Sequence, residues 1–281
     1  MSWLVFALVF WLGAWALNAV LANSGWRDTR LVRIFVPVLF GITLLVLWEG
    51  LVRGLGVSPV ILPAPSTVAQ TFARSTGLLW GDFHQTVVKG ALTGFAIGAS
   101  AAFVAAVLID RSAFLTRGLL PIGNFVAALP IIGIAPILVS WFGFDWQSKA
   151  AVVVVMVFFP ILVNTVQGLR ETDAMQRDLM RTYAAGYLQT LLKLRLPAAM
   201  PFVFNGLKIA TTLALIGAIV AEYFGSPTRG MGFRISTGVG SLSIDLVWAE
   251  IFVAAIAGTA FYGIVVWIER AVTFWHPSQR K

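Results

Sequence analysis

Residues 181–201 read RTYAAGYLQTLLKLRLPAAMP and lie between two long hydrophobic runs. The stretch is too basic to lie inside a lipid bilayer, because a cation at the bilayer centre costs about 2.5–3.5 kcal/mol on insertion scales. It is also too apolar to be a free tail. The stretch therefore predicts a segment held at one face of a membrane, and the apolar runs around it indicate the fold class.

The composition is that of an integral membrane protein. Of 281 residues, 59% are hydrophobic and 11% charged, against about 45–50% and about 25% in soluble domains. A spanning helix needs about 20 mostly apolar residues. We therefore predict an all-α membrane fold, with candidate spans at residues 1–22, 34–52, 86–109, 115–142, 147–169, 198–224 and 246–269.

The composition and the motifs that the sequence lacks argue against several classes of function. The formal charge of +8 is scattered over short loops without aromatic-interleaved patches, so we expect no nucleic-acid partner. With no cysteine, and with His84 and His276 far apart, we expect no metal site, no catalytic residues and no enzyme activity. No G-x-x-x-x-G-K-[ST] motif occurs, so the chain cannot bind ATP by that device.

The distribution of cations predicts the topology. Residues 1–22 lack the basic start and cleavage site of a secretory signal, which indicates a retained first span. If residues 170–197 are cytoplasmic, most of the 20 Lys and Arg fall inside, in loops 23–33, 110–114 with Arg117, 170–197 and the tail from 270. The positive-inside rule then places the N-terminus outside and the C-terminus in the cytoplasm. The membrane would be the plasma membrane of a bacterium or archaeon.

Three segments interrupt the simple pattern of spans. The run 115–142 contains Pro121, Pro130 and Pro136, so it is either a kinked structural helix or a lining of a substrate path. Residues 57–75 predict a short amphipathic helix with Ser66 or Thr67 as its N-cap. The glycine-rich residues 225–245 predict irregular or re-entrant backbone.

The opening stretch has an amphipathic helical period. A helix starting at about Arg177 would place apolar residues at spacings of three and four, namely Leu179, Met180, Tyr183, Tyr187, Leu188, Leu191 and Leu192. Such a helix either rests on the lipid interface or docks into a groove of a partner. Periodicity alone leaves both alternatives open.

This segment resembles the cytoplasmic signature loop of ABC importer permeases, in which Glu-Ala-Ala, three residues, Gly and a later Leu-Pro form a helix that docks on an ATPase. In that register Asp178 takes the place of Glu, while Leu179, Met180 and Ala184 depart from Ala, Ala and Gly. The resemblance implies a set of ATPase-coupling residues: Asp178, Arg181, Thr182, Tyr183, Ala185, Gln189, Leu196 and Pro197.

The resemblance covers about residues 55–275. Residues 62–66 (LPAPS), 141–143 (WFG), 159–161 (FPI) with Asn164, and Ala221-Glu222 before the glycine-rich residues 230–232 look like the nitrate/sulfonate/taurine branch of these permeases. This implies a type I importer bundle of six core transmembrane helices plus one extra N-terminal helix. Residues 1–33 would form the accessory helix and a basic cytoplasmic loop, and 34–281 the permease domain, with its core at about 85–270.

The family resemblance also implies the partners. We expect a second permease copy in a homodimer, two cytoplasmic ATPase subunits that carry the ATP and Mg, and an external substrate-binding protein. This chain itself would hold no cofactor.

Charged residues near the ends of the predicted spans are expected to reach the membrane interface; they are Glu49, Asp110, Lys149, Glu222, Glu250 and Glu269. Glu222 is also a site candidate, because it adjoins the glycine-rich loop. Lys208 lies deep in a span, one turn after Asn205, and would either contact substrate or form a buried pair that fixes helix packing. The candidate substrate path comprises Pro130, Pro136, Asn164, Asn205, Lys208 and Glu222.

The sequence thus predicts the permease subunit of an ABC importer for a small organic solute or anion, such as a pyrimidine or flavin-type vitamin precursor, a sulfonate, taurine or nitrate. A vitamin precursor is favoured because no arginine lies deep in a span to pair with an oxyanion. The alternative is a gradient-driven secondary transporter without an ATPase, which predicts paired midplane carboxylates. A membrane scaffold that recruits a partner without transport is a third hypothesis.

Overall fold

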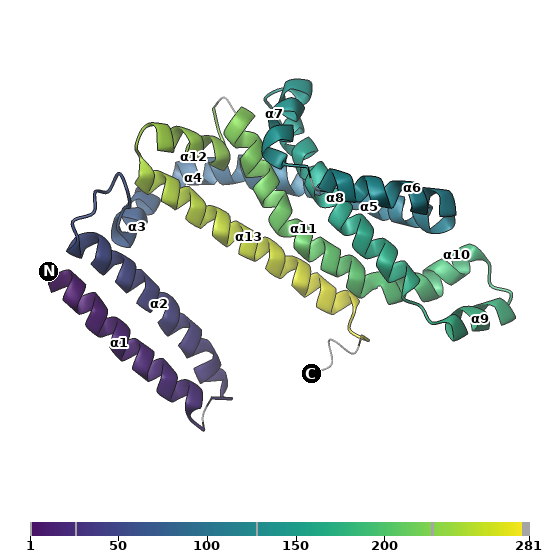
Figure 1. Cartoon of the computed structure of the whole chain (residues 1–281), viewed down its shortest axis with the longest axis horizontal. Coiled ribbons are helices and arrows are strands. Elements are labelled where there is room, and N and C mark those ends of the chain that lie inside the picture. Colours follow the sequence, from purple (N-terminus) through teal and green to yellow (C-terminus); the bar gives the residue numbers. More distant parts are fainter. Residues whose placement is uncertain (1, 26, 128, 226–227, 277–281) are drawn as a thin grey trace. The chain divides into compact units, whose positions relative to one another are not determined.

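A computed structural model describes residues 2–25, 27–127, 129–225 and 228–276, and every regular element in these ranges is a helix (Figure 1). Within these ranges, six stretches are long and apolar enough to cross a membrane: Ser2–Asn23, Arg30–Gly54, Thr76–Arg111, Trp146–Arg170, Tyr187–Gly225 and Ile244–Val272. The predicted all-α membrane fold is confirmed. Arg280 and Lys281, which we counted among the cytoplasmic cations, lie outside the described residues.

The chain forms two compact units. The first contains the residues up to Leu79 together with Thr237–Glu250, and the second contains Trp80–Ser236 together with the residues from Ile251. Each unit is built from parts distant in sequence, because the long helix α13 (Ile244–Val272) begins in the first and continues in the second.

The first unit is built on a hairpin of α1 (Ser2–Asn23) and α2 (Arg30–Gly54). Small residues let the two backbones approach closely: a Cβ atom at Gly50 would lie 2.2 Å from Cβ of Ala7, and one at Gly54 would lie 2.7 Å from Cβ of Leu4. Such close packing of small residues is typical of helices in lipid. Most other side chains of α1 are apolar and exposed, as expected for a helix surrounded by lipid.

The short helix α3 (Pro65–Arg74) confirms the amphipathic helix predicted in residues 57–75, but the predicted N-cap is wrong. Ala64 is the N-cap and Pro65 occupies the first turn, where its missing N–H costs nothing. The Ser66 hydroxyl instead donates to Glu49 of α2 at 2.7 Å, and the Ser66 backbone N–H donates to the same carboxylate at 2.9 Å.

The second unit is centred on α5 (Thr93–Arg111), α8 (Trp146–Arg170) and α11 (Leu196–Gly225). Their shared core consists of small and β-branched side chains, including Ala106, Val157, Ile161, Ala210 and Ala214. Gly94 and Gly98 of α5 lie so close to α8 that an added Cβ would come within 2.5 and 2.4 Å of valine side-chain atoms. The core therefore holds three long helices in close contact.

The predicted span 115–142 is not one helix. It is divided into α6 (Ala113–Ala127) and α7 (Ile131–Phe142), with Pro130 as the N-cap of α7. Proline lacks a backbone donor and disfavours helical geometry in the preceding residue, so the helix breaks there. Pro136 lies inside α7 and is exposed. With 15 and 12 residues, neither helix reaches the length of a full span.

The glycine-rich region also contains regular structure that we did not expect. Residues Met231–Gly240 form a helix, α12, which is too short to cross a bilayer. The preceding Gly230 has φ +120°, a conformation that favours glycine, and it turns the chain into the start of α12. The glycines thus permit one tight turn and close approaches rather than an irregular loop.

Candidate functional site

The segment that we predicted as one amphipathic helix consists of two short helices. Helix α9 spans Ala174–Thr182 and α10 spans Tyr187–Thr190. The π-helical turn η2 (Leu191–Arg195) continues α10 into α11. The prediction of a continuous helix from Arg177 is therefore wrong, and the predicted loop 170–197 is shorter, because helix resumes at Tyr187.

A Schellman motif ends α9 and explains the break. Ala184 has φ +50°, its N–H donates to the Arg181 carbonyl at 2.8 Å, and the Ala185 N–H donates to the Met180 carbonyl at 3.0 Å. Glycine is preferred at such a left-handed position. Ala184 is the residue at which the signature pattern has Gly, so the backbone conformation typical of that glycine is kept although the residue differs.

The α9–α10 segment (residues 174–190) exposes large apolar side chains. Tyr183 is 76% exposed and Leu188 67%, and Met175, Leu179 and the adjoining Leu192 are also exposed. Groups of exposed apolar side chains often occur where a protein meets a partner or a membrane. The surface is therefore available to a partner or to the lipid interface.

The structure brings some of the predicted coupling residues together. Arg181 Nη1 donates to Asp178 Oδ1 at 3.0 Å, and Thr182 Oγ1 donates to the Asp178 carbonyl at 3.1 Å. The side chain of Gln189 accepts from the Gly186 N–H at 3.1 Å and so caps α10. Leu196 and Pro197 lie apart from this group, in the first turn of α11.

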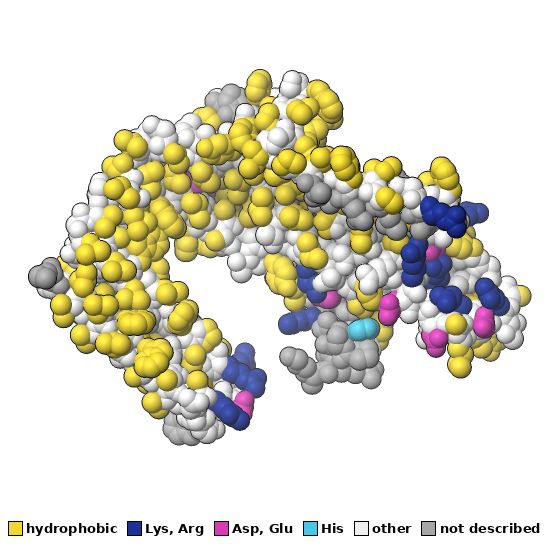
Figure 2. All heavy atoms as spheres, viewed as in Figure 1, with side chains coloured by type: hydrophobic (Ala, Val, Ile, Leu, Met, Phe, Trp, Pro, Cys, Tyr) yellow, Lys and Arg dark blue, Asp and Glu magenta, His cyan; other side chains and the backbone are white. Residues whose placement is uncertain are grey.

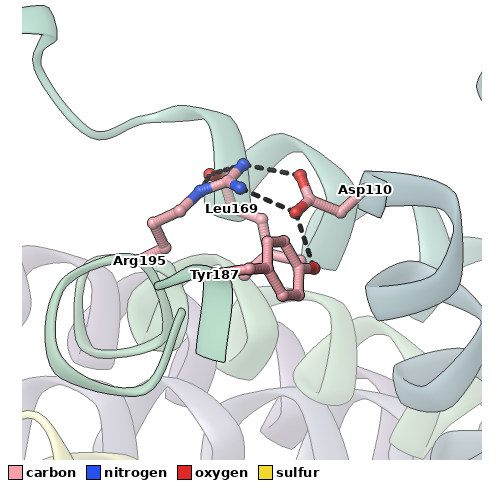
Figure 3. A network of polar contacts seen from close by, with 4 residues as sticks. All are labelled: Asp110, Leu169, Tyr187 and Arg195. Atoms are coloured by element: carbon pink, nitrogen blue, oxygen red, sulfur yellow. Dashed lines mark hydrogen bonds and ion pairs between the residues drawn. The ribbon is translucent and has the colours of Figure 1, made fainter. Parts of the chain in front are cut away.

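Four residues, Asp110, Leu169, Tyr187 and Arg195, form the Arg195 network (Figure 3). Its largely buried ion pair between Arg195 and Asp110 anchors the α9–α10 segment to the helix core. The guanidinium binds both carboxylate oxygens of Asp110, at 2.7 and 2.5 Å, and also donates to the Leu169 carbonyl at 3.0 and 2.8 Å. Tyr187 donates its hydroxyl proton to Asp110 at 3.1 Å. Arg195 thereby ties the end of α5, the end of α8 and the start of α11 to one another.

The π-helical turn lies beside this network. In η2 the Leu196 N–H donates to the Leu191 carbonyl, five residues earlier, and Pro197 follows directly without an N–H of its own. A wider turn avoids a steric clash of the proline ring with the carbonyl four residues earlier. Sequence reasoning missed the contacts of Arg195 and counted it only as a loop cation. We also expected Asp110 to reach the interface, whereas its side chain is only 5% exposed.

At the opposite end of α11 lies a second polar group, the Glu222 network of Asp82, Thr86, Glu222 and residues 230–234. Thr86 Oγ1 donates to Glu222 Oε2 at 2.6 Å, and the Gly232 N–H donates to the same oxygen at 3.1 Å. The Met231 N–H donates to Thr86 Oγ1 at 2.8 Å. Thr86 belongs to η1 (His84–Leu92), a second π-helical segment. Glu222 therefore joins η1, α11 and the start of α12.

Asp82 provides the second link of this network. It accepts from the Gly230 N–H at 2.8 Å and from Arg234 Nε at 2.9 Å, so it holds the turn that precedes α12. Thr86 and Glu222 are fully buried and Asp82 is 1% exposed, while Glu222 Oε1 has no hydrogen-bond partner among the described residues. Sequence reasoning missed Asp82 and Thr86, because nothing in their local sequence indicates a partner about 140 residues away.

The structure corrects the expectation that charges near the span ends reach the interface. Lys149 is fully buried, and its ammonium donates to the Gly225 carbonyl at 2.8 Å and to the Phe144 carbonyl. Glu222 and Glu250 are also fully buried, and Glu269 is 7% exposed. The helix ends of this protein thus carry buried polar contacts where we expected solvated charges.

Polar side chains continue along α11 between the two networks. Asn205 Nδ2 donates to Asn164 Oδ1 on α8 at 3.0 Å. One turn further, Lys208 Nζ lies 2.9 Å from Glu269 Oε2 on α13. Of the two alternatives for Lys208, the geometry favours the pair that fixes helix packing. Among the candidate path residues, Asn164, Asn205 and Lys208 are thus brought near each other, whereas Pro130, Pro136 and Glu222 belong to other parts of the unit.

We predict that Lys208→Met lowers the thermal stability of the purified protein, because it leaves the largely buried Glu269 carboxylate without its cation. The expected loss is about 1.5–3 kcal/mol, as for a hydrogen bond to a charged group. The double variant Lys208→Met/Glu269→Leu should recover most of the melting temperature. If the double variant is less stable than Lys208→Met alone, the pair does not act as the geometry indicates.

Comparison with known proteins matches residues 94–274 to the family described as "Binding-protein-dependent transport system inner membrane component". A Haemophilus influenzae protein named "Probable ABC transporter permease protein" is 34% identical over 84% of this chain and 96% of its own length. The formylaminopyrimidine transport permease protein of Halalkalibacterium halodurans is 32% identical over 86% of this chain and 96% of that protein. The riboflavin transport system permease protein of Chloroflexus aurantiacus is 30% identical over 84% and 88%. These findings agree with the predicted ABC permease and not with the gradient-driven alternative.

Proposed function

The chain belongs to the family of binding-protein-dependent transport system inner membrane components and is an ABC transporter permease subunit, and from this premise we propose how it converts the work of an ATPase into substrate movement. The ATPase would be a separate cytoplasmic dimer that holds the ATP and Mg. A second copy of the permease and an external substrate-binding protein would complete the importer. The predicted orientation, with the N-terminus outside and the C-terminus in the cytoplasm, is part of this proposal.

The observation that carries the proposal is the set of exposed apolar side chains of the α9–α10 segment, which includes Tyr183 and Leu188. An amphipathic helix with an exposed apolar face can fill a hydrophobic groove of a partner. Asp178 and Arg181 form an exposed ion pair beside that surface, where they would set the orientation of docking more than its affinity. We therefore assign ATPase docking to this segment.

The Arg195 network would transmit movement of the docked segment into the membrane. A short helix on a flexible loop could move without consequence, but Arg195 binds α5 and α8 at the point where the chain enters α11. Helix α11 has 30 residues, hence a length of about 45 Å at 1.5 Å per residue. A displacement at its cytoplasmic end would therefore reach Glu222 through one continuous helix.

The Glu222 network would serve as the external gate. Its buried hydrogen bonds hold the start of α12 on Thr86 of η1 and Glu222 of α11, and the preceding turn on Asp82. Opening toward the external side would separate α12 from Glu222 and Asp82, and closing would restore the bonds. An element with two discrete arrangements, one bonded and one separated, can couple a movement at one end of α11 to a change at the other end. The polar side chains Asn164, Asn205 and Lys208 lie between the two networks and are proposed to line the path.

The substrate is proposed to be a small organic nutrient of the pyrimidine or flavin type. Two of the relatives are named for formylaminopyrimidine and riboflavin transport, and another for taurine. In the proposed path the cation Lys208 is paired with Glu269, so it is already neutralised and is a weak partner for a sulfonate. The amides of Asn164 and Asn205 suit the polar edges of a heterocycle, because each offers both a donor and an acceptor.

The test is uptake into proteoliposomes that contain this chain, its ATPase subunit and the external binding protein. We expect uptake of labelled riboflavin or formylaminopyrimidine that requires internal ATP, survives collapse of ion gradients by ionophores and exceeds uptake of taurine. Uptake driven by an ion gradient without the ATPase subunit would contradict the coupling. Preferential uptake of taurine would contradict the substrate class and leave the coupling intact.

A further inference from the structure

We propose that the groove between α1 and α2 is a binding site for one anionic phospholipid, with an acyl chain in the groove and the phosphate on the arginines at its end. The site lies entirely within the hairpin of the first unit. Nothing in the permease mechanism above uses it.

The groove has a volume of about 370 Å³, within the range of about 300–1,000 Å³ that holds small ligands in proteins. On α1 the groove is lined by two tryptophans, an asparagine and two alanines: Trp11, Trp15, Asn18, Ala19 and Ala22. On α2 it is lined by Val36, Pro37, Phe40 and Thr43. Trp15 is 65% exposed and Phe40 58%. A groove with these walls in a membrane helix hairpin fits a hydrocarbon chain.

The arginines lie on the same stripe of α2 as the groove. Arg33 precedes Val36 and Pro37 by three and four residues, and Arg30 precedes Arg33 by three, so all of them share one face of the helix. Along α2, Arg33 lies about 6 Å from Pro37 at 1.5 Å per residue. A lipid whose chain lies against Pro37 and Phe40 would therefore place its phosphate among these guanidinium groups.

Among the described residues, the acids at this end of the hairpin do not balance its arginines. Arg27 and Arg33 share a single acid, Asp28, at 3.6 and 3.5 Å, and all three side chains are at least 69% exposed. Figure 2 shows cationic side chains gathered at this end of the α1–α2 hairpin, with apolar side chains along the rest of it. Basic clusters beside membrane helices attract anionic lipid, at about 1 kcal/mol per Lys or Arg.

A polar atom inside the groove gives an independent indication of a ligand. Asn18 Oδ1 is buried and has no hydrogen-bond partner among the described residues, and Asn18 lines the groove. An unsatisfied acceptor in an apolar environment is unfavourable. A hydroxyl group of the lipid headgroup or glycerol could donate a hydrogen bond to Asn18 Oδ1, whereas a hydrocarbon chain alone could not.

The test uses the full chain in nanodiscs of equimolar phosphatidylglycerol and phosphatidylcholine, each in turn carrying a photoreactive acyl chain. We expect phosphatidylglycerol to crosslink to peptides covering residues 11–22 and 36–43 in preference to phosphatidylcholine. The double variant Arg30→Gln/Arg33→Gln should reduce that preference about 30-fold, the equivalent of two guanidinium contacts. Ala19→Phe, which fills the groove, should abolish crosslinking of both lipids at these peptides.

The matched control is Arg270→Gln, which removes an exposed arginine near the end of α13 and should leave the preference unchanged. Size-exclusion chromatography identifies any variant that fails to fold. In that case the lipid preference of Arg33→Lys, which keeps the charge, is compared with that of Arg33→Gln. Equal crosslinking of the two lipids to the unaltered chain would overturn the proposal. So would the absence of lipid crosslinks at the peptides that cover residues 11–22 and 36–43.

Discussion

Arg195→Leu is expected to abolish ATP-driven uptake and to lower the free energy of unfolding by about 3–5 kcal/mol. The leucine leaves the Asp110 carboxylate, 5% exposed, without its cation and without both guanidinium hydrogen bonds. It also leaves the Leu169 carbonyl without its donor. The start of α11 would then no longer be tied to α8, and the Tyr187 hydroxyl would be the remaining hydrogen bond of the network between the α9–α10 segment and α5. Thermal unfolding of the purified chain and uptake by the reconstituted complex measure the two effects.

Two further variants separate stability from coupling. Arg195→Lys keeps the charge but cannot form the two parallel hydrogen bonds of the guanidinium, so we expect intermediate stability and reduced uptake. Arg195→Leu/Asp110→Leu removes the uncompensated charge and should recover much of the stability, as replacement of buried ion pairs by apolar residues often does. Uptake should stay low in the double variant, because the tie to α11 is still missing. Full uptake by the stable double variant would show that the Arg195 network is not needed for coupling.

Gly232→Ala is expected to lower the free energy of unfolding by about 2–5 kcal/mol and uptake at least tenfold, through overpacking and loss of a buried hydrogen bond. An added Cβ would lie 2.0 Å from the Ile219 carbonyl oxygen and 2.8 Å from Glu222 Cβ. Because the first of these is a backbone atom, α12 must move away from α11. The Glu222 carboxylate would then lose the Gly232 N–H while staying buried.

Gly240→Ala is the matched control for this prediction. Gly240 ends the same helix, and nothing lies within 4 Å of an added Cβ. Alanine has the higher helix propensity, so this variant should retain uptake and unfold at the same or a slightly higher temperature. A Gly232→Ala protein with normal uptake would mean that close contact between α12 and α11 is not needed for gating.

The sequence was sufficient to predict the elements whose formation depends on long apolar runs. Spans such as Trp146–Arg170 and Ile244–Val272 follow from length and hydropathy alone. The helix breaks were harder to predict. Pro130 breaks the run 115–142 as its chemistry allows, yet Pro160 and Pro201 lie within continuous helices. The outcome at each proline depends on the neighbouring helices that satisfy the freed carbonyls.

The candidate site residues divide in the same way. Asp178, Arg181 and Thr182 could be proposed from the sequence because a linear motif groups them, and the structure places them in one short helix. Arg195, Asp82 and Thr86 could not, since their roles depend on partners 85, 148 and 136 residues away. The left-handed Ala184 was also outside prediction, because its conformation is set by the helix end and the residue type there is not glycine.

The most direct test of the account is whether ATP opens the Glu222 network. The chain has no cysteine and Met231 is fully buried, so Met231→Cys introduces a single thiol that is protected while the network is closed. We predict that an impermeant thiol reagent added outside proteoliposomes labels this thiol faster when the ATPase turns over. We also predict that Arg195→Leu removes that increase. Labelling at one rate with and without ATP would contradict the claim that α11 links the two networks.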